Sequence, residues 1–172
     1  MHLRLHNSSQ ITRRYLTPFL FKSSALTHRH NQSVNPIENK TISSNIMASK
    51  KILILDDDLD ILAVMQLLFK TKGFDVVALS RWEEVYDKVE TFKPHLILLD
   101  VLLSGNDGRD ICRDLKHKSS TKTIPIVMFS ANPSAADNIH EYGADDFIHK
   151  PFEVSDLLNT INKHLQRAAQ NA

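Results

Sequence analysis

The chain has 172 residues, 24% of them charged, and a formal net charge of +1 at pH 7. Residues 1–50 hold seven Lys or Arg against one acid, whereas residues 51–172 hold fourteen against nineteen, a net charge of −5. This charge balance excludes a protein that binds nucleic acid nonspecifically through clustered basic residues within residues 51–172. The single cysteine, Cys112, excludes an intramolecular disulfide. No apolar stretch approaches the roughly 20 residues that span a bilayer, so we expect a soluble, cytoplasmic protein without a membrane partner.

The N-terminal region, residues 1–49, is rich in Ser, Thr, Asn and His and shows no sustained hydrophobic period. This pattern predicts a disordered extension. An acid-poor leader with Arg and Ser also suits an organelle transit peptide, and that interpretation stays open. We prefer a third interpretation, in which Met47 is the functional start, because Met-Ala-Ser-Lys-Lys leads directly into the first predicted strand.

From residue 51 onward, short apolar runs alternate with segments of helical period. The runs are mostly uninterrupted, which is typical of parallel strands covered on both faces. In chain order, the predicted strands span residues 52–55, 74–79, 96–99, 124–129 and 147–148. The helix after the first strand has an apolar stripe from Ile61 to Phe69, and Gly73 can end it in the left-handed region. The next helix starts at Ser80, with Glu83 completing a capping box.

Three further helices follow the later strands. The third follows Gly108 and has apolar residues at 111, 112 and 115, and the fourth opens at Pro133 and stops at Gly143. The fifth has an apolar stripe from Leu157 to Leu165. Five β-α repeats with right-handed crossovers predict an α/β fold: a doubly wound five-stranded parallel sheet in the flavodoxin-like order 2-1-3-4-5, with five helices.

This domain is expected to span residues 50–167, with 168–172 as a short C-terminal tail. A chain that ends so soon after the last helix leaves no room for a DNA-binding or catalytic output domain. We therefore expect a stand-alone module that contacts no nucleic acid directly and acts through a protein partner.

Polar groups follow four of the predicted strands: Asp56-Asp57-Asp58, Asp100, Ser130 and Lys150. The carboxyl ends of parallel strands meet at one edge of an open sheet, so these groups are expected in one pocket. Two carboxylates about 5 Å apart repel by roughly 3 kcal/mol at an effective dielectric near 20, so a cation must offset them. An all-oxygen set of carboxylates favours Mg²⁺.

The alternative interpretation of the acidic run is structural, with Asp58 and Asp60 capping the next helix and complementing its dipole. The joint placement of Lys150 and Ser130 favours the pocket, since an ammonium pairs with one phosphoryl oxygen and a hydroxyl hydrogen-bonds another. An Asp nucleophile there would form an acyl phosphate.

Four blocks of this sequence resemble, in order, the signature blocks of the receiver domain of two-component response regulators. The resemblance covers roughly residues 51–165. The four blocks are Lys51-Ile-Leu-Ile-Leu-Asp-Asp-Asp58, Pro94 to Gly108, Ile124-Pro-Ile-Val-Met-Phe-Ser-Ala131 and Gly143-Ala-Asp-Asp-Phe-Ile-His-Lys-Pro-Phe152.

The resemblance implies a role for each residue of the pocket. Asp100 would be the phosphoacceptor, and Asp56 and Asp57 the acidic pair. Mg²⁺ would be held by Asp57, Asp100 and the backbone carbonyl of Leu102, with Asp56 acting through water. Lys150 would pair with the phosphoryl group.

The resemblance also implies a conformational switch. Ser130 matches the family's switch hydroxyl and Phe147 its switch aromatic, and the Lys150-Pro151 bond would be cis. Phosphorylation would draw Ser130 toward the phosphoryl group and turn Phe147 inward, remodelling the face of helix 4, strand 5 and helix 5. That face is also a candidate surface for a homodimer.

The function implied is a phosphoacceptor of a two-component phosphorelay, phosphorylated by a histidine kinase or a histidine phosphotransfer protein and signalling to an unknown downstream protein. We expect no enzyme activity beyond self-phosphorylation from small phosphodonors and autodephosphorylation. The alternative is an aspartyl phosphohydrolase of the haloacid dehalogenase type, with Asp56 as nucleophile and Asp58 as acid, although Leu59-Asp60 replaces the usual Gly-Thr. A docking module that works without phosphorylation would normally have lost a member of the site.

Two positions of the pocket loop need separate comment. Ser104 stands where the family often has Pro, so the loop after Asp100 is expected to be less rigid. Leu102 flanks the expected approach to the acyl phosphate, and we hypothesise that it obstructs water and lengthens the lifetime of the phosphoryl group.

Overall fold

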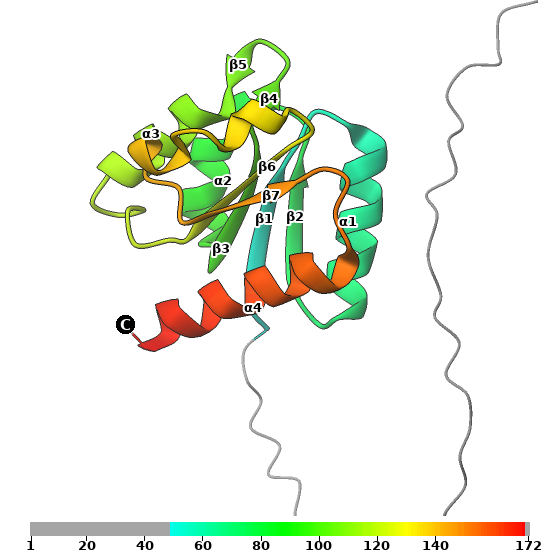
Figure 1. Ribbon diagram of the computed structural model, residues 1–172. Coiled ribbons are helices and arrows are strands. Elements are labelled where there is room, and N and C mark those ends of the chain that lie inside the picture. The colour runs from blue at the N-terminus through cyan, green and yellow to red at the C-terminus, as the bar shows by residue number, and fades with distance from the viewer. Residues whose placement is uncertain (1–48, 171–172) are drawn as a thin grey trace, which may run out of the picture. The chain divides into compact units, whose positions relative to one another are not determined.

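The structure is a computed structural model that describes residues 49–170. Its centre is a five-stranded sheet in which neighbouring strands are all parallel, in the order β2-β1-β3-β6-β7 (Figure 1). The strands are β1 (Lys51–Leu55), β2 (Asp75–Leu79), β3 (Leu96–Asp100), β6 (Ile126–Ser130) and β7 (Asp146–His149). This confirms the predicted fold class, and the sheet order is the flavodoxin-like 2-1-3-4-5.

Helices cover both faces of the sheet (Figure 1). Apolar side chains of α1 and α4 pack on one face, and those of α2 and α3 pack on the other. Within residues 49–170, the four α-helices are α1 (Leu59–Thr71), α2 (Val85–Phe92), α3 (Gly108–His117) and α4 (Val154–Gln170). Because both faces are covered, every residue of β3 is buried, and the same holds for β6.

Shorter elements complete the described part of the chain. Three 3-10 helices are η1 (Trp82–Glu84), η2 (Pro133–Ala136) and η3 (Ile139–Tyr142). A small antiparallel hairpin, β4 (Leu102–Leu103) with β5 (Asn106–Asp107), lies between β3 and α3.

The predicted fourth helix over residues 133–143 is wrong. The segment forms η2 and η3, which are separated by Asp137 in an extended conformation and by Asn138 with φ of 60°. Asp and Asn are poor helix formers, because their side chains compete for backbone hydrogen bonds and Asn tolerates the left-handed region. Gly143 does end this segment, with φ of 83°.

The predicted capping box at Ser80 and Glu83 is also wrong. The 3-10 helix η1 comes first, and α2 begins only at Val85, with Glu84 at its N-cap and no side-chain capping bond. By contrast, Gly73 does follow α1 in the left-handed region, with φ of 85°. The apolar stripe of α2 is buried at Val85 and Val89, so packing determines where this helix begins.

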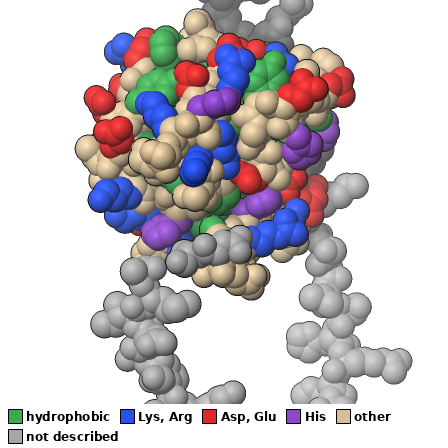
Figure 2. Space-filling view, turned by 90° about the vertical axis from the view of Figure 1, so that its left-hand side faces the viewer, with side chains coloured by type: hydrophobic (Ala, Val, Ile, Leu, Met, Phe, Trp, Pro, Cys, Tyr) green, Lys and Arg blue, Asp and Glu red, His purple; other side chains and the backbone are tan. Residues whose placement is uncertain are grey.

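The predicted extension over residues 1–49 and the proposed start at Met47 lie almost entirely outside the described residues. Within residues 49–170, none of the helices is long and apolar enough to cross a membrane. The face shown in Figure 2 carries lysine, arginine, acidic and histidine side chains interspersed with one another, rather than a field of one sign.

Candidate functional site

The functional side chains predicted from the sequence lie at the carboxyl ends of the sheet strands. Asp56 directly follows β1, Asp100 is the last residue of β3, Ser130 is the last residue of β6, and Lys150 directly follows β7. Strands β1 and β3 are neighbours at the point where the strand order reverses. This is the edge of an open α/β sheet at which ligands bind.

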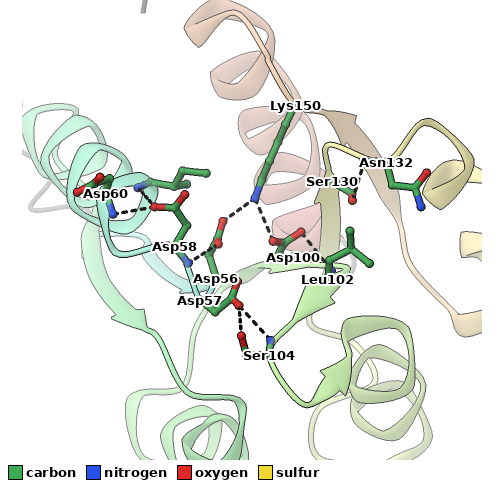
Figure 3. A network of polar contacts seen from close by, with 11 residues as sticks. Asp56, Asp57, Asp58, Asp60, Asp100, Leu102, Ser104, Ser130, Asn132 and Lys150 are labelled. Carbon is green, nitrogen blue, oxygen red and sulfur yellow. Dashed lines mark hydrogen bonds and ion pairs between the residues drawn. The ribbon is translucent and has the colours of Figure 1, made fainter. Parts of the chain in front are cut away.

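Lys150 joins two of the acids. Its Nζ donates a hydrogen bond to Oδ2 of Asp56 at 2.7 Å and another to Oδ2 of Asp100 at 3.0 Å (Figure 3). Asp56 is 0% exposed and Asp100 is 5% exposed, so both ion pairs are formed away from bulk water. The same Nζ lies 4.4 Å from the centroid of the Phe129 ring, a cation-π contact that could not be predicted from the sequence. The peptide bond from Lys150 to Pro151 is cis.

Three carboxylates converge beside this amine. One oxygen from each of Asp56, Asp57 and Asp100 lies within 4.8 Å of the other two. No His or Cys belongs to this cluster of described residues, so the donor set is all oxygen and suits a hard cation such as Mg²⁺ better than zinc. A single lysine cannot neutralise three carboxylates, which leaves net negative charge for a divalent ion.

The environment of Asp100 differs from that of a surface carboxylate. Burial raises the pKa of its carboxyl above the ordinary value, and the hydrogen bond and charge of Lys150 act in the opposite direction. The neighbouring charge of Asp56 also raises the pKa of Asp100. A carboxylate kept partly desolvated in this way is a better nucleophile than one solvated by water.

Asp58 does not join the cluster. Its Oδ1 accepts hydrogen bonds from the backbone N–H of Asp60 and of Ile61, so it is the N-cap of α1. The structural interpretation of the acidic run is therefore correct for Asp58, while Asp56 and Asp57 belong to the carboxylate cluster with Asp100 (Figure 3).

Asp57 has a partner that sequence reasoning missed. Ser104, in the loop after Asp100, donates to Oδ2 of Asp57 from its backbone N–H at 3.0 Å and from its Oγ at 2.6 Å. The sequence shows Ser in place of the family's frequent Pro at position 104, but only the fold brings residues 57 and 104 together. The expectation of a less rigid loop did not include these two hydrogen bonds.

The remaining predicted residues surround Asp100 or lie along the neighbouring strands. The N–H of Leu102 is 3.4 Å from Oδ1 of Asp100, and the Leu102 side chain is 54% exposed. Ser130 is buried, and its Oγ accepts a hydrogen bond from the N–H of Asn132. Phe147 is half-buried on β7. Its ring is edge-on to the ring of His149, and the two ring centroids are 4.8 Å apart.

Residues 52–162 match the family model described as the response regulator receiver domain. The chain belongs to this family. A putative response regulator from Chloroflexus aurantiacus J-10-fl is 31% identical, with a TM-score of 0.65, over 69% of this chain and 98% of that one. The BeF3-activated N-terminal receiver domain of Klebsiella pneumoniae RstA is 30% identical, with a TM-score of 0.62, over 67% of this chain and 98% of that one.

A third receiver domain supports the same assignment. The CheY-like response regulator receiver domain protein from Methanospirillum hungatei JF-1 is 25% identical, with a TM-score of 0.67, over 73% of this chain and all of that chain. Receiver domains are signalling modules rather than a family of catalytic enzymes. The phosphohydrolase alternative is therefore wrong, and its proposed acid, Asp58, caps α1.

Proposed function

We propose that this receiver domain takes a phosphoryl group onto Asp100 from a phosphohistidine of a histidine kinase or a histidine phosphotransfer protein. The observation that carries the proposal is the placement of Lys150 between Asp56 and Asp100, at 2.7 Å and 3.0 Å. An amine so placed can pair with an oxygen of the incoming phosphoryl group while Asp100 is oriented to attack.

The proposed step is a simple displacement. An oxygen of the Asp100 carboxylate forms a bond to phosphorus, the bond from phosphorus to the histidine nitrogen breaks, and the imidazole leaves with the electron pair. The product is an acyl phosphate on Asp100. Lys150 pairs with the charge on the phosphoryl oxygens, and Ser130, at the end of β6, has a hydroxyl that can donate to another of them.

Mg²⁺ would be held by Asp57, Asp100 and the backbone carbonyl of Leu102, with Asp56 acting through water. When bound, the ion supplies positive charge that offsets the charge on the transferring group. The three carboxylates within 4.8 Å support this assignment.

The signal would pass to a protein partner through Ser130 and Phe147. Phe147 is only half-buried in a strand whose other apolar residue, Ile148, is buried, so its ring has room to change its packing. A turn of this ring, following a movement of Ser130 toward the phosphoryl group, would remodel the surface of η2, η3, β7 and α4. The downstream partner or a second copy of the chain would bind there. We expect this exchange to take place in the cytoplasm.

The test is labelling of the full chain with acetyl phosphate and Mg²⁺, followed by intact mass spectrometry. The wild type should gain one phosphoryl group that hydroxylamine removes, and Asp100→Asn should gain none. Asp60→Asn, which removes an exposed carboxylate from the first turn of α1, is the matched control and should be labelled normally. Labelling that persists in Asp100→Asn would show that the phosphoacceptor is a different residue.

A further inference from the structure

The loop between Asp100 and α3 is built as a tight hairpin. Leu102 pairs with Asp107 and Leu103 with Asn106 in an antiparallel register, which leaves Ser104 and Gly105 as a two-residue turn. Gly105 has φ of 83°, a conformation that glycine adopts at little cost. The register of so short a hairpin is determined by its turn, so Ser104 has a defined place at the tip.

Both ends of the hairpin are held. At its start, the N–H of Leu102 faces Oδ1 of Asp100 at 3.4 Å. At its end, Asp107 is the N-cap of α3 and its Oδ1 accepts a hydrogen bond from the N–H of Arg109. At the tip, a Cβ on Gly105 would lie 4.0 Å from Nε1 of Trp82, so the turn packs beside the indole ring.

Ser104, at the tip of this hairpin, contacts the loop that follows β1. Its N–H and its Oγ both donate to Oδ2 of Asp57, at 3.0 Å and 2.6 Å (Figure 3). The two residues are 47 positions apart in the sequence, and their hydrogen bonds connect the loop after β1 to the loop after β3. Asp56 and Asp57 lie in the first of these loops, and Asp100, the last residue of β3, directly precedes the second.

We propose that Ser104 is a positioning residue for the divalent cation, because it holds the Asp57 carboxylate in the orientation that lets it share an ion with Asp56 and Asp100. This inference rests on the proposed function and adds to it a residue that does not touch the ion. A carboxylate has about four lone-pair sites, so Asp57 can accept both bonds from Ser104 and still bind a cation. Outer partners of this kind fix the rotamer of a ligand, and their loss costs about 10-fold to 100-fold in metal affinity.

The test is the dissociation constant of Mg²⁺ alone, without phosphodonor, for the full chain. Trp82 is the only tryptophan and lies beside Gly105, so its fluorescence reports on the hairpin during a Mg²⁺ titration, and calorimetry gives an independent value. Ser104→Ala removes the Oγ donor and should weaken Mg²⁺ binding by about 10-fold. Ser104→Thr keeps a hydroxyl and should restore binding to near the wild-type value.

The matched control is Thr91→Val, which removes an exposed hydroxyl near the end of α2. That hydroxyl bonds only to backbone carbonyls of its own helix, so its loss should leave Mg²⁺ affinity unchanged. Urea unfolding of each variant in EDTA measures stability separately from affinity. Equal or tighter binding by Ser104→Ala would overturn the proposal, and so would equal losses in Ser104→Ala and Ser104→Thr.

The two proposals fail in different ways. A wild-type chain that shows no Mg²⁺ binding would contradict the metal site of the proposed function itself. A wild type that binds Mg²⁺ and is labelled on Asp100, together with a Ser104→Ala variant that binds equally well, would remove only the role of Ser104.

Discussion

The Nζ of Lys150 lies 3.0 Å from Oδ2 of Asp100, although 50 residues separate them in the sequence. Because the same amine also pairs with the fully buried Asp56, it is the positive charge that offsets two desolvated carboxylates. This arrangement has consequences for stability that are independent of phosphorylation.

Lys150→Met should lower the free energy of unfolding in EDTA by about 3–5 kcal/mol, because it leaves two buried carboxylates without their partner. Mg²⁺ should recover part of this loss, since it binds only the folded chain. Urea unfolding with and without Mg²⁺ measures both effects. Lys163→Met is the control: its amine is 48% exposed and pairs with Asp146, so its loss should cost less than about 1 kcal/mol. Equal losses in the two variants would contradict this account of Lys150.

Gly108 is required by the close approach of α3 to the end of β3. A Cβ at this position would overlap the backbone carbonyl oxygen of Asp100. Gly108→Ala should therefore lower the free energy of unfolding by about 1–3 kcal/mol and displace Asp100, reducing its rate of labelling. Gly73→Asn is the control, because Gly73 has open space around it and Asn tolerates its positive φ. A Gly108→Ala variant as stable and as reactive as the control would disprove the requirement.

Asp146 should contribute to stability at neutral pH and lose that contribution in acid. Burial alone would raise the pKa of Asp146, but hydrogen bonds from Lys163 and His164 outweigh it and lower that pKa to about 2. The unfolded chain has the ordinary value near 3.9, so the stability is present above about pH 4 and is lost as the pH falls toward 2.

Asp146→Asn should thus lower the free energy of unfolding at pH 7 by about 1–2 kcal/mol. It should also make that free energy decrease less steeply as the pH falls from about 4 to about 2. Urea unfolding over this pH range is the measurement, with Glu90→Gln, an exposed change on α2, as the reference. A slope that Asp146→Asn leaves unaltered would show that other groups cause the acid sensitivity.

Leu102 is predicted to lengthen the lifetime of the acyl phosphate. Its side chain is 54% exposed beside Asp100, where it can exclude water from the phosphoryl group. Leu102→Asn should therefore speed dephosphorylation severalfold, as followed by the decay of labelled protein after removal of the phosphodonor. Leu67→Asn, which changes a leucine on α1 that is 67% exposed, should not. The hypothesis is wrong if the two variants lose phosphate at the same rate.

Cys112 should be unreactive in the folded chain. It is fully buried, and burial raises the pKa of its thiol to about 12, so almost no thiolate exists at neutral pH. Iodoacetamide should modify it only after unfolding in urea, with a native rate at least about 100-fold lower. Rapid modification of the native chain would place Cys112 in an exposed, activated environment.

Much of the fold could be predicted because the relevant signals are local. A run such as Leu96-Ile-Leu-Leu99 is apolar without alternation, which is typical of a strand covered on both faces. The convergence of Asp56, Asp100 and Lys150 also followed from the sequence, because each comes at the end of a strand and parallel strands end at one edge.

The errors occurred where competing local conformations are close in energy. Residues 133–143 have a Pro at the start and a Gly at the end, as a helix would, yet Asp137 and Asn138 adopt extended and left-handed conformations that split the segment in two. In the same way, the start of α2 at Val85 reflects burial against the sheet rather than the polar residues before it.

Sequence alone was sufficient to locate the strands and to name the residues that gather at one edge of the sheet, since hydrophobic period and strand ends are properties of short segments. The strand order was predicted from the five β-α repeats and their right-handed crossovers. Only the tertiary structure decided which side chains touch. The bonds of Ser104 to Asp57 and the cation-π contact of Lys150 with Phe129 join residues far apart in the chain. Such contacts depend on ångström-scale distances between packed elements, and no periodicity in the sequence encodes those distances.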